Sequence, residues 1–322
     1  MKALFVAAAM LMGFAAPAVA QTTTLKYAFV NPMSSHFGAA ATTFKEFVEK
    51  ESAGKIKVDI FPGGALGGER EIVESLQLGT VDMAMTGTSI MGNFVPEVLL
   101  YDVPFLFKDT RQARAVLDGQ IGKDVLAKFE DKDLVGLGYG ENGFKMLTNN
   151  KKPVLKPEDL VGMTIRVQEN EIHIAAFKQL GARPTPIAWP ELYAALQQGV
   201  VDGQDNPISN VLSAKFFQVQ KYGTLLRHVF APTVITMSSA TWGKLSDADK
   251  AIVQAAVAKA VATQRAAVDE YETSGLAKLK EGGMQIVETV DTAAFVEKLA
   301  PANEIFAKRF GQDKFDAIRA MN

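Results

Sequence analysis

Two segments of the chain carry nearly the same sequence. Residues 76–82 read Leu-Gln-Leu-Gly-Thr-Val-Asp, and residues 196–202 read Leu-Gln-Gln-Gly-Val-Val-Asp. In both copies a stretch with helical spacing precedes the shared glycine, and an apolar, strand-like stretch follows it. Helix–glycine–strand junctions are common in α/β proteins, so chance similarity is the alternative. Because Leu, Gln, Gly, Val and Asp all recur in register, the pattern favours two α/β lobes built on one plan, with a ligand cleft between them.

The stretches upstream of each copy have the same predicted order of elements. Strands that alternate with helices predict a mostly parallel sheet. In the first lobe we expect strands at 25–30, 56–61 and 81–85, a helix at 36–51, and a second helix that ends at Gly79. In the second lobe we expect strands at 163–168, 183–187 and 200–202, helices at 169–180 and 190–198, and a turn-rich loop at 203–207.

A third feature is a long helical pattern that contains no proline. It runs from Ser246, a good N-cap residue, to about Lys280. A helix of about 30 residues spans roughly 45 Å, which is enough to bridge both lobes. The alternative is two helices broken at Gly275. The predicted division is a signal peptide at 1–20, lobe I at 21–143 plus 232–271, and lobe II at 144–231 plus 272–322.

The N-terminus is typical of a secretory signal. Met1-Lys2 precedes an apolar run at 3–16, and Pro17-Ala18-Val19-Ala20 provides an Ala-x-Ala cleavage site before Gln21. This predicts a periplasmic protein. The sequence has no cysteine, which excludes both a lipid anchor at the cleavage site and disulfide bonds. With 34 Lys and Arg against 36 Asp and Glu, the charge balance argues against nucleic acid or an anionic membrane as partner.

Motifs for cofactors and catalysis are weak in this sequence. Residues 138–143 match G-x-G-x-x-G, but a strand-like stretch at 144–149 follows where a dinucleotide site needs a helix, so we expect a crossing between the lobes. His36, His173 and His228 lack the spacing of metal ligands. We therefore expect no metal, no cofactor and no enzyme activity. An enzyme whose catalytic residues assemble only in space is the alternative.

Arg166 is the charged residue that most suggests a ligand. It lies within the short apolar strand of residues 163–167, where a guanidinium needs a carboxylate partner or an exposed face. Its two parallel N–H groups would suit a ligand carboxylate. Asn206, in the predicted loop, could contact a second oxygen, and Trp189 could form an apolar wall. Each of the three could instead be purely structural.

Several stretches closely resemble the solute-binding proteins of TRAP transporters, the tripartite ATP-independent periplasmic systems, and in particular their dicarboxylate-binding subgroup. The resemblance spans essentially the whole mature chain and is most specific between Arg166 and Pro207. It rests on residues 61–71, 79–83, 102–107, 165–170, 175–186 and 193–207.

The resemblance implies a two-lobed protein that closes on an organic anion. In the family the arginine of the I-R-V strand pairs with the ligand carboxylate, which here is Arg166. The asparagine of the D-G-Q-E-N-P loop is a second contact. That asparagine is Asn206 here, and by position the remaining candidate contacts are Asp205 where Glu is usual, Trp189 where Phe is usual, Lys145, Thr233, His36 and Thr88. The lack of an acidic residue near Thr88 argues against sialic acid.

The function that the resemblance implies is capture of a small organic acid and delivery to the small and large membrane subunits of a TRAP permease. A second cation at Lys145 favours a C4-dicarboxylate such as succinate, malate or fumarate. The alternatives are a sugar acid or another monocarboxylate on the same scaffold, or a role as a periplasmic ligand sensor. We expect a monomer, because both lobes must face the permease.

Overall fold

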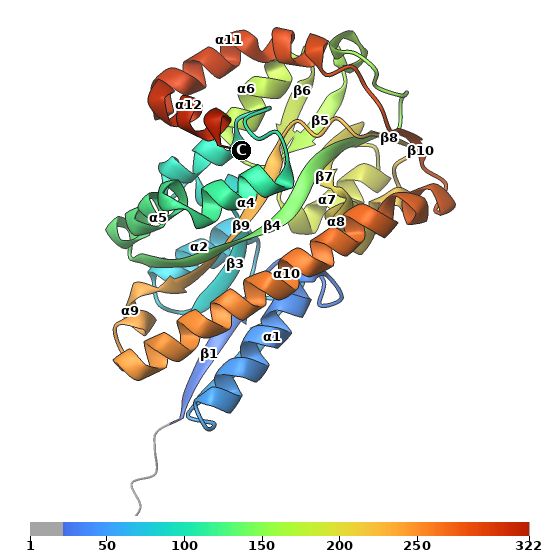
Figure 1. Cartoon of the computed structure of the whole chain (residues 1–322). Coiled ribbons are helices and arrows are strands. Elements are labelled where there is room, and N and C mark those ends of the chain that lie inside the picture. Colours follow the sequence, from blue (N-terminus) through green and yellow to red (C-terminus); the bar gives the residue numbers. More distant parts are fainter. Residues whose placement is uncertain (1–21, 322) are drawn as a thin grey trace, which may run out of the picture.

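The computed structural model describes residues 22–321, so the predicted signal peptide lies outside the described residues. Within this range, ten strands form one continuous, twisted sheet with helices packed on both faces (Figure 1). The path through the sheet is β2-β1-β3-β9-β4-β7-β5-β6, and β8 joins it by pairing with β4 and β10. The strands are β1 (Thr23–Ala28), β2 (Ile56–Phe61), β3 (Met83–Gly87), β4 (Leu134–Asn149), β5 (Thr164–Val167), β6 (Arg183–Pro186), β7 (Gly203–Pro207), β8 (Tyr222–Thr224), β9 (Phe230–Ser238) and β10 (Gln285–Val287).

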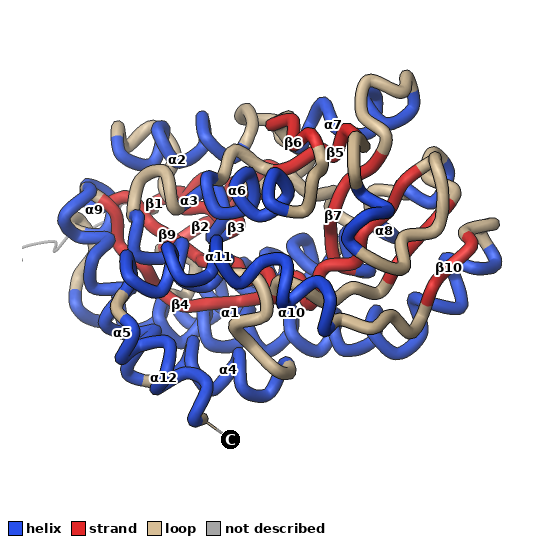
Figure 2. The backbone as a smooth tube through the Cα atoms, turned by 90° about the horizontal axis from the view of Figure 1, so that it is seen from above, coloured by secondary structure: helices blue, strands red, loops and turns tan. Residues whose placement is uncertain are grey.

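The helices connect these strands in the order expected of an α/β protein. They cover both sides of the sheet when it is seen from above (Figure 2). They are α1 (His36–Glu51), α2 (Glu69–Gln77), α3 (Thr88–Met91), α4 (Thr110–Asp118), α5 (Gln120–Leu126), α6 (Glu171–Gln179), α7 (Trp189–Gln197), α8 (Ile208–Ser213), α9 (Ser239–Trp242), α10 (Asp247–Glu281), α11 (Ala293–Phe310) and α12 (Gln312–Ala320). Short 3-10 turns include η1 (Pro96–Asp102).

The internal repeat corresponds to two similar halves of the sheet. In the first half β1 pairs in parallel with β2 and β3, and in the second half β5 pairs in parallel with β6 and β7. The shared glycines end α2 and α7, and Gly79 and Gly199 both have a φ of +70°. This left-handed conformation favours glycine, which explains why glycine recurs at this point of the repeat.

The expectation of a mostly parallel sheet needs a correction at the centre. Strand β9 is antiparallel to β3 and β4, and β4 is also antiparallel to β7. Strand β4 is 16 residues long and continues through the G-x-G-x-x-G segment, with irregularities at Gly136/Gly138 and Glu141/Gly143. The segment therefore links the two halves of the sheet, as predicted, but as one strand rather than two.

A second correction concerns residues 203–207, which we expected to form a loop. They form strand β7, which is hydrogen-bonded to β4 on one side and β5 on the other. The stretch Gly-Gln-Asp-Asn-Pro lacks the apolar and β-branched residues that mark strands in a sequence. Its strand conformation is set by its two neighbours, and all five residues are buried.

The long helix α10 is continuous, which rejects the alternative of a break at Gly275. Ser246 caps it by accepting a hydrogen bond from the backbone N–H of Asp249. A Cβ at position 275 would lie 2.5 Å from Ile208 and 2.7 Å from Leu212, so the glycine allows α10 to pass close to α8. Nearer its N-terminal end, α10 packs beside α1 (Figure 1). The bounds of the two lobes stay a prediction.

Candidate ligand-binding site

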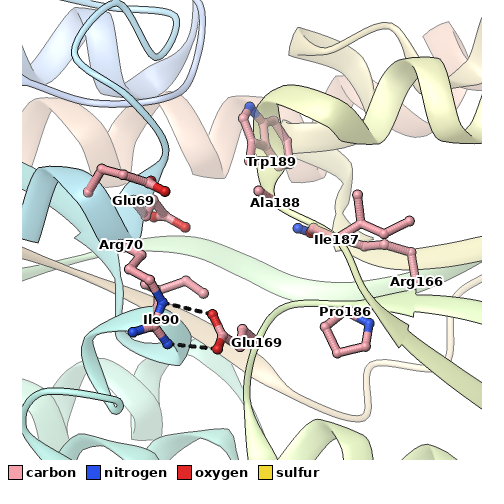
Figure 3. A pocket seen from close by; sticks show the side chains of 10 residues that line it. Glu69, Arg70, Ile90, Arg166, Glu169, Pro186, Ile187, Ala188 and Trp189 are labelled. Atoms are coloured by element: carbon pink, nitrogen blue, oxygen red, sulfur yellow. Dashed lines mark hydrogen bonds and ion pairs between the residues drawn. The ribbon is translucent and has the colours of Figure 1, made fainter.

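A cavity lies between the two halves of the sheet, and we call it the outer pocket. Its volume is about 320 Å³, at the small end of the range for ligand pockets. Residues of α2 and α3 face residues of β5, β6 and α7 across it (Figure 3). Its lining consists of Glu69, Arg70, Glu71, Ile90, Arg166, Glu169, Pro186, Ile187, Ala188 and Trp189.

Arg166 is the cation on the second-half side of the outer pocket. It is 2% exposed, and its Nε donates to the backbone carbonyl of Ile187 at 2.9 Å. Among residues 22–321 its terminal nitrogens have no hydrogen-bonded or ion-pair partner. Burial lowers the pKa of Arg166 to about 10, although the negative charges of Asp205 and Glu69 oppose this. The group stays charged at neutral pH, so it is a buried cation that lacks a paired anion.

Glu69 faces Arg166 from the opposite side of the outer pocket (Figure 3). It is the first residue of α2, and its carboxylate accepts a hydrogen bond of 2.7 Å from the backbone N–H of Gly87. Burial raises the pKa of Glu69, while the Gly87 hydrogen bond and the charge of Arg166 oppose the change. The outer pocket therefore presents one unpaired guanidinium and one carboxylate to a bound molecule.

A smaller space, the inner pocket, adjoins the outer pocket and shares Glu69 and Trp189 with it. Its volume is about 20 Å³, enough for roughly one water molecule. Amide side chains are concentrated here: Asn31 donates to Asn210 at 3.2 Å, Asn210 donates to Asn206 at 3.1 Å, and Asn206 donates to Gln204. The lining consists of Val30, Asn31, Phe37, Glu69, Gly87, Ser89, Asn142, Lys145, Gln168, Trp189, Asn206, Asn210, Ala231 and Pro232.

Lys145 lies at the inner pocket but is held by the protein itself. It is 1% exposed, and its Nζ lies 3.2 Å from the Asp205 carboxylate and 3.4 Å from Nδ1 of His173. Nε2 of His228 lies 3.2 Å from the same Asp205 oxygen. Burial by itself would raise the pKa of Asp205, but the charge of Lys145 and the His228 contact outweigh it and hold that pKa far below its usual range. The Lys145–Asp205 pair is thus an internally compensated ion pair.

Three further sequence candidates lie behind the pocket lining. Thr88 donates to the carbonyl of Pro232 at 3.3 Å, and Thr233 donates to Gln264 at 3.3 Å. Nε2 of His36 lies 2.6 Å from Oδ1 of Asn142, which itself lines the inner pocket. The structure therefore brings Arg166, Trp189, Lys145 and Asn206 to the two pockets, and it places Asp205 and these three residues one layer behind. Their contact with ligand stays a prediction.

Several lining residues were not predicted from the sequence, and Glu69 is the most important of them. An acidic residue in the first turn of a helix is common because it stabilises the helix dipole, so its position gave no separate signal of a site. Ile90 and Ile187 add an apolar surface beside Trp189. They come from a short helix and from the segment after β6, which only the folded chain brings together.

Within residues 22–321, no group of three or more His, Asp or Glu side chains is arranged to hold a metal ion. No helix in this part of the chain is long and apolar enough to cross a membrane.

Known proteins with the same fold as this chain include several that were solved with small organic acids. Residues 27–309 match the bacterial extracellular solute-binding proteins of family 7, also called DctP. A TRAP periplasmic solute-binding protein from Polaromonas, solved with bound D-erythronate, is 49% identical, with a TM-score of 0.92 over 93% of this chain and 99% of that one. A Bordetella protein with density interpreted as pantoate is 48% identical, with a TM-score of 0.91 over 94% and 100% of the two chains.

A more distant relative binds a different class of acid. The TRAP solute-binding protein of Sulfurospirillum deleyianum, solved with succinate, is 34% identical, with a TM-score of 0.89 over 94% of this chain and 100% of that one. These relatives share the fold across almost the full described length, and each was solved with a small organic acid in place. The chain belongs to this family, the periplasmic solute-binding proteins of TRAP transporters, which bind small organic acids and are not enzymes.

Proposed function

We propose that this protein captures a small hydroxylated monocarboxylate and delivers it to the membrane subunits of a TRAP transporter. The sequence analysis favoured a C4-dicarboxylate and kept sugar acids and other monocarboxylates as the alternative. The relatives at 49% and 48% identity favour that alternative, because D-erythronate and pantoate each carry one carboxylate and hydroxyl groups. Succinate, with two carboxylates, belongs to the relative at 34% identity.

The observation that carries the proposal is the single unpaired cation in the outer pocket. Arg166 is buried, charged and without an anionic partner among the described residues. A buried charge that lacks a partner is unfavourable, and an incoming carboxylate would relieve this with two parallel hydrogen bonds. The ligand carboxylate therefore belongs at the terminal nitrogens of Arg166.

The charges around the pocket argue against a second ligand carboxylate. Lys145, the cation that led us to expect a dicarboxylate, is already paired with Asp205. Arg70 is paired with Glu169 at 2.7 Å. Glu69 adds a negative charge that would repel a second carboxylate but can accept hydrogen bonds from hydroxyl groups. One carboxylate and several hydroxyls fit this charge pattern better than two carboxylates.

The remaining walls fit a short, partly apolar molecule. Asn142, Asn206 and Asn210 offer amide groups that can both donate to and accept from hydroxyls. Ile90 and Trp189 provide apolar surface on the outer side. The volume of about 320 Å³ suits an acid of a few carbons.

A thermal-shift screen of organic acids tests this proposal, since a tight ligand stabilises the folded state by mass action. We expect D-erythronate or pantoate to raise the melting temperature more than succinate at equal concentration, and calorimetry to give a tighter Kd. The Glu69→Gln variant should show a smaller difference in Kd between succinate and the hydroxylated monocarboxylates. If succinate binds the wild-type protein as tightly as every hydroxylated monocarboxylate tested, the proposed ligand class is wrong.

Delivery to a permease requires a separate test, because a periplasmic sensor would use the same cleft. Purified protein added to vesicles that contain the small and large TRAP membrane subunits should start uptake of the ligand, and the ligand should be recovered unchanged. The control is uptake by the same vesicles with a solute-binding protein already known to serve that permease. If that control works and this protein binds ligand but starts no uptake, a role as sensor is favoured.

A further inference from the structure

A partly exposed ion pair in the lining of the outer pocket joins the two halves. Arg70, on α2 in the first half, donates from Nε to one oxygen of Glu169 at 2.9 Å, and from a terminal nitrogen to the other oxygen at 2.7 Å. Glu169 belongs to the loop between β5 and α6 in the second half. Figure 3 shows this two-point contact, and both residues form part of the pocket lining.

Further contacts fix both partners in place. The side chain of Asn93 donates to the backbone carbonyl of Glu169 at 2.8 Å. The guanidinium of Arg70 lies 5.8 Å from the ring centre of Phe94, a cation–π contact that orients it. Next to Glu169, the buried Asn170 donates to Ser89 and to Asp102, each at 3.0 Å. The Arg70–Glu169 pair is thus the exposed edge of a set of contacts that joins the two halves.

We propose that the Arg70–Glu169 pair is a latch that holds the pocket mouth closed and slows escape of the bound acid. The latch rests on the proposed function, since it acts on the ligand of the same pocket. Arg70 and Glu169 here are positioning residues, because they neutralise each other and leave Arg166 as the group that pairs with the ligand. Separating the halves would return both charges to water.

The size of the effect follows from the exposure of the pair. Arg70 is 37% and Glu169 is 55% exposed, so water and salt weaken their attraction. The two-point geometry places this pair at the upper end of the range for surface pairs, about 0.7–1 kcal/mol, so it shifts an equilibrium by about three- to fivefold. Separation of the two halves would break the pair, so this factor should act on ligand release and leave association nearly unchanged.

The test is a mutant cycle read by stopped-flow fluorescence of Trp189, one of the chain's two tryptophans, with D-erythronate as probe. Arg70→Ala and Glu169→Gln should each raise the dissociation rate constant about three- to fivefold, and the double variant should do no more than either alone. Salt at about 1 M should remove the difference from wild type. Unchanged dissociation rates, or effects that add in the double variant, would overturn the latch.

A matched control is available on the same molecule. Arg309 pairs with Glu171 at 2.7 Å with nearly the same exposure, 39% and 60%, and neither residue lines the outer pocket. Arg309→Ala should leave the dissociation rate constant unchanged. If it accelerates release as much as Arg70→Ala does, loss of any surface pair has the effect and the latch is wrong.

A ligand-free measurement separates failure of the latch from failure of the proposed function. The sequence has no cysteine, so Leu78→Cys and Val200→Cys, on exposed matching turns of the two halves, give unique sites for spin labels. In the ligand-free protein, Arg70→Ala should raise the ratio of molecules with the longer label-to-label distance to those with the shorter one by about threefold. This holds even if D-erythronate is not a ligand, and an unchanged distribution would contradict the latch.

Discussion

Two buried cations lie within one cleft, and they differ in what surrounds them. Lys145 is 1% exposed and sits 3.2 Å from the Asp205 carboxylate, with His173 and His228 close by. Arg166 is 2% exposed, and the partner of its Nε is a backbone carbonyl. Burial is the same at both sites, but compensation of charge is not. An uncompensated buried charge, rather than burial alone, therefore marks the position that awaits an anion.

The two sites should therefore respond to mutation in opposite ways. A group whose charge is compensated inside the protein contributes to folding, and its loss leaves the partner unpaired. A group that awaits a ligand contributes to binding, and its loss relieves the free protein.

Loss of Lys145 should have the largest effect, and it should act on stability. Lys145→Ala leaves the Asp205 carboxylate buried without its main counter-charge, which lowers the free energy of unfolding by about 3–5 kcal/mol. Chemical denaturation followed by circular dichroism measures this. The double variant Lys145→Ala/Asp205→Asn should recover part of the loss, because the stranded charge is gone. A single variant as stable as wild type would show that the pair is not structural.

Loss of Arg166 should act on binding instead. Arg166→Ala should weaken binding of the cognate acid by about 2–5 kcal/mol, roughly 30- to several-thousand-fold, as measured by calorimetry. The free energy of unfolding without ligand should stay the same or rise. Arg166→Lys should not restore affinity, because an ammonium cannot make the two parallel hydrogen bonds. Undiminished affinity in either variant would place the carboxylate elsewhere.

The third prediction concerns His36, a buried group that is neutral in the folded protein. Burial lowers its pKa from 6.5 to about 4, although the hydrogen bond with Asn142 opposes the shift. As the pH falls below 6.5 the unfolded chain takes up a proton that the folded protein refuses, so stability is lost between about pH 6.5 and 4. Over this range His36 should lower the free energy of unfolding by about 3 kcal/mol.

This pH dependence can be assigned to His36 by comparison with His36→Gln, whose amide can keep a hydrogen bond to Asn142. Denaturation curves between pH 7 and 4 should show a steeper loss in wild type than in the variant. Burial also lowers the pKa of His228. Because His228 is present in both proteins, the difference between the two sets of curves reports on His36 alone. If wild type and the variant lose stability equally with falling pH, His36 has the same pKa in the folded and unfolded states, and this prediction is wrong.

Much of the fold follows from local patterns in the sequence. The repeated Leu-Gln-x-Gly segment correctly predicted two matching helix ends, because Gly79 and Gly199 take the same left-handed conformation. The long helical pattern predicted α10 to within a residue or two, since its N-cap is local. The failures lie in β7 and at the centre of β4, where pairing with distant strands, rather than residue preference, determines the conformation.

The candidate site was less accessible to sequence reasoning. Arg166 stands out because a charge in an apolar strand breaks a local pattern. The pairing of Lys145 with Asp205 and His228 could not be foreseen, since it joins three distant segments of the chain. Glu69 gave no signal beyond that of an ordinary first-turn acid. Charge compensation is a property of the folded protein, so the prediction that Lys145 would bind a second carboxylate rested on position alone.

The most direct test of the central claim is a crystal structure of the wild-type protein grown with D-erythronate or pantoate. We expect the ligand carboxylate to lie within hydrogen-bond distance of both terminal nitrogens of Arg166, with the Lys145–Asp205 pair intact. A carboxylate bound to Lys145, with Arg166 paired to a side chain of the protein, would contradict it.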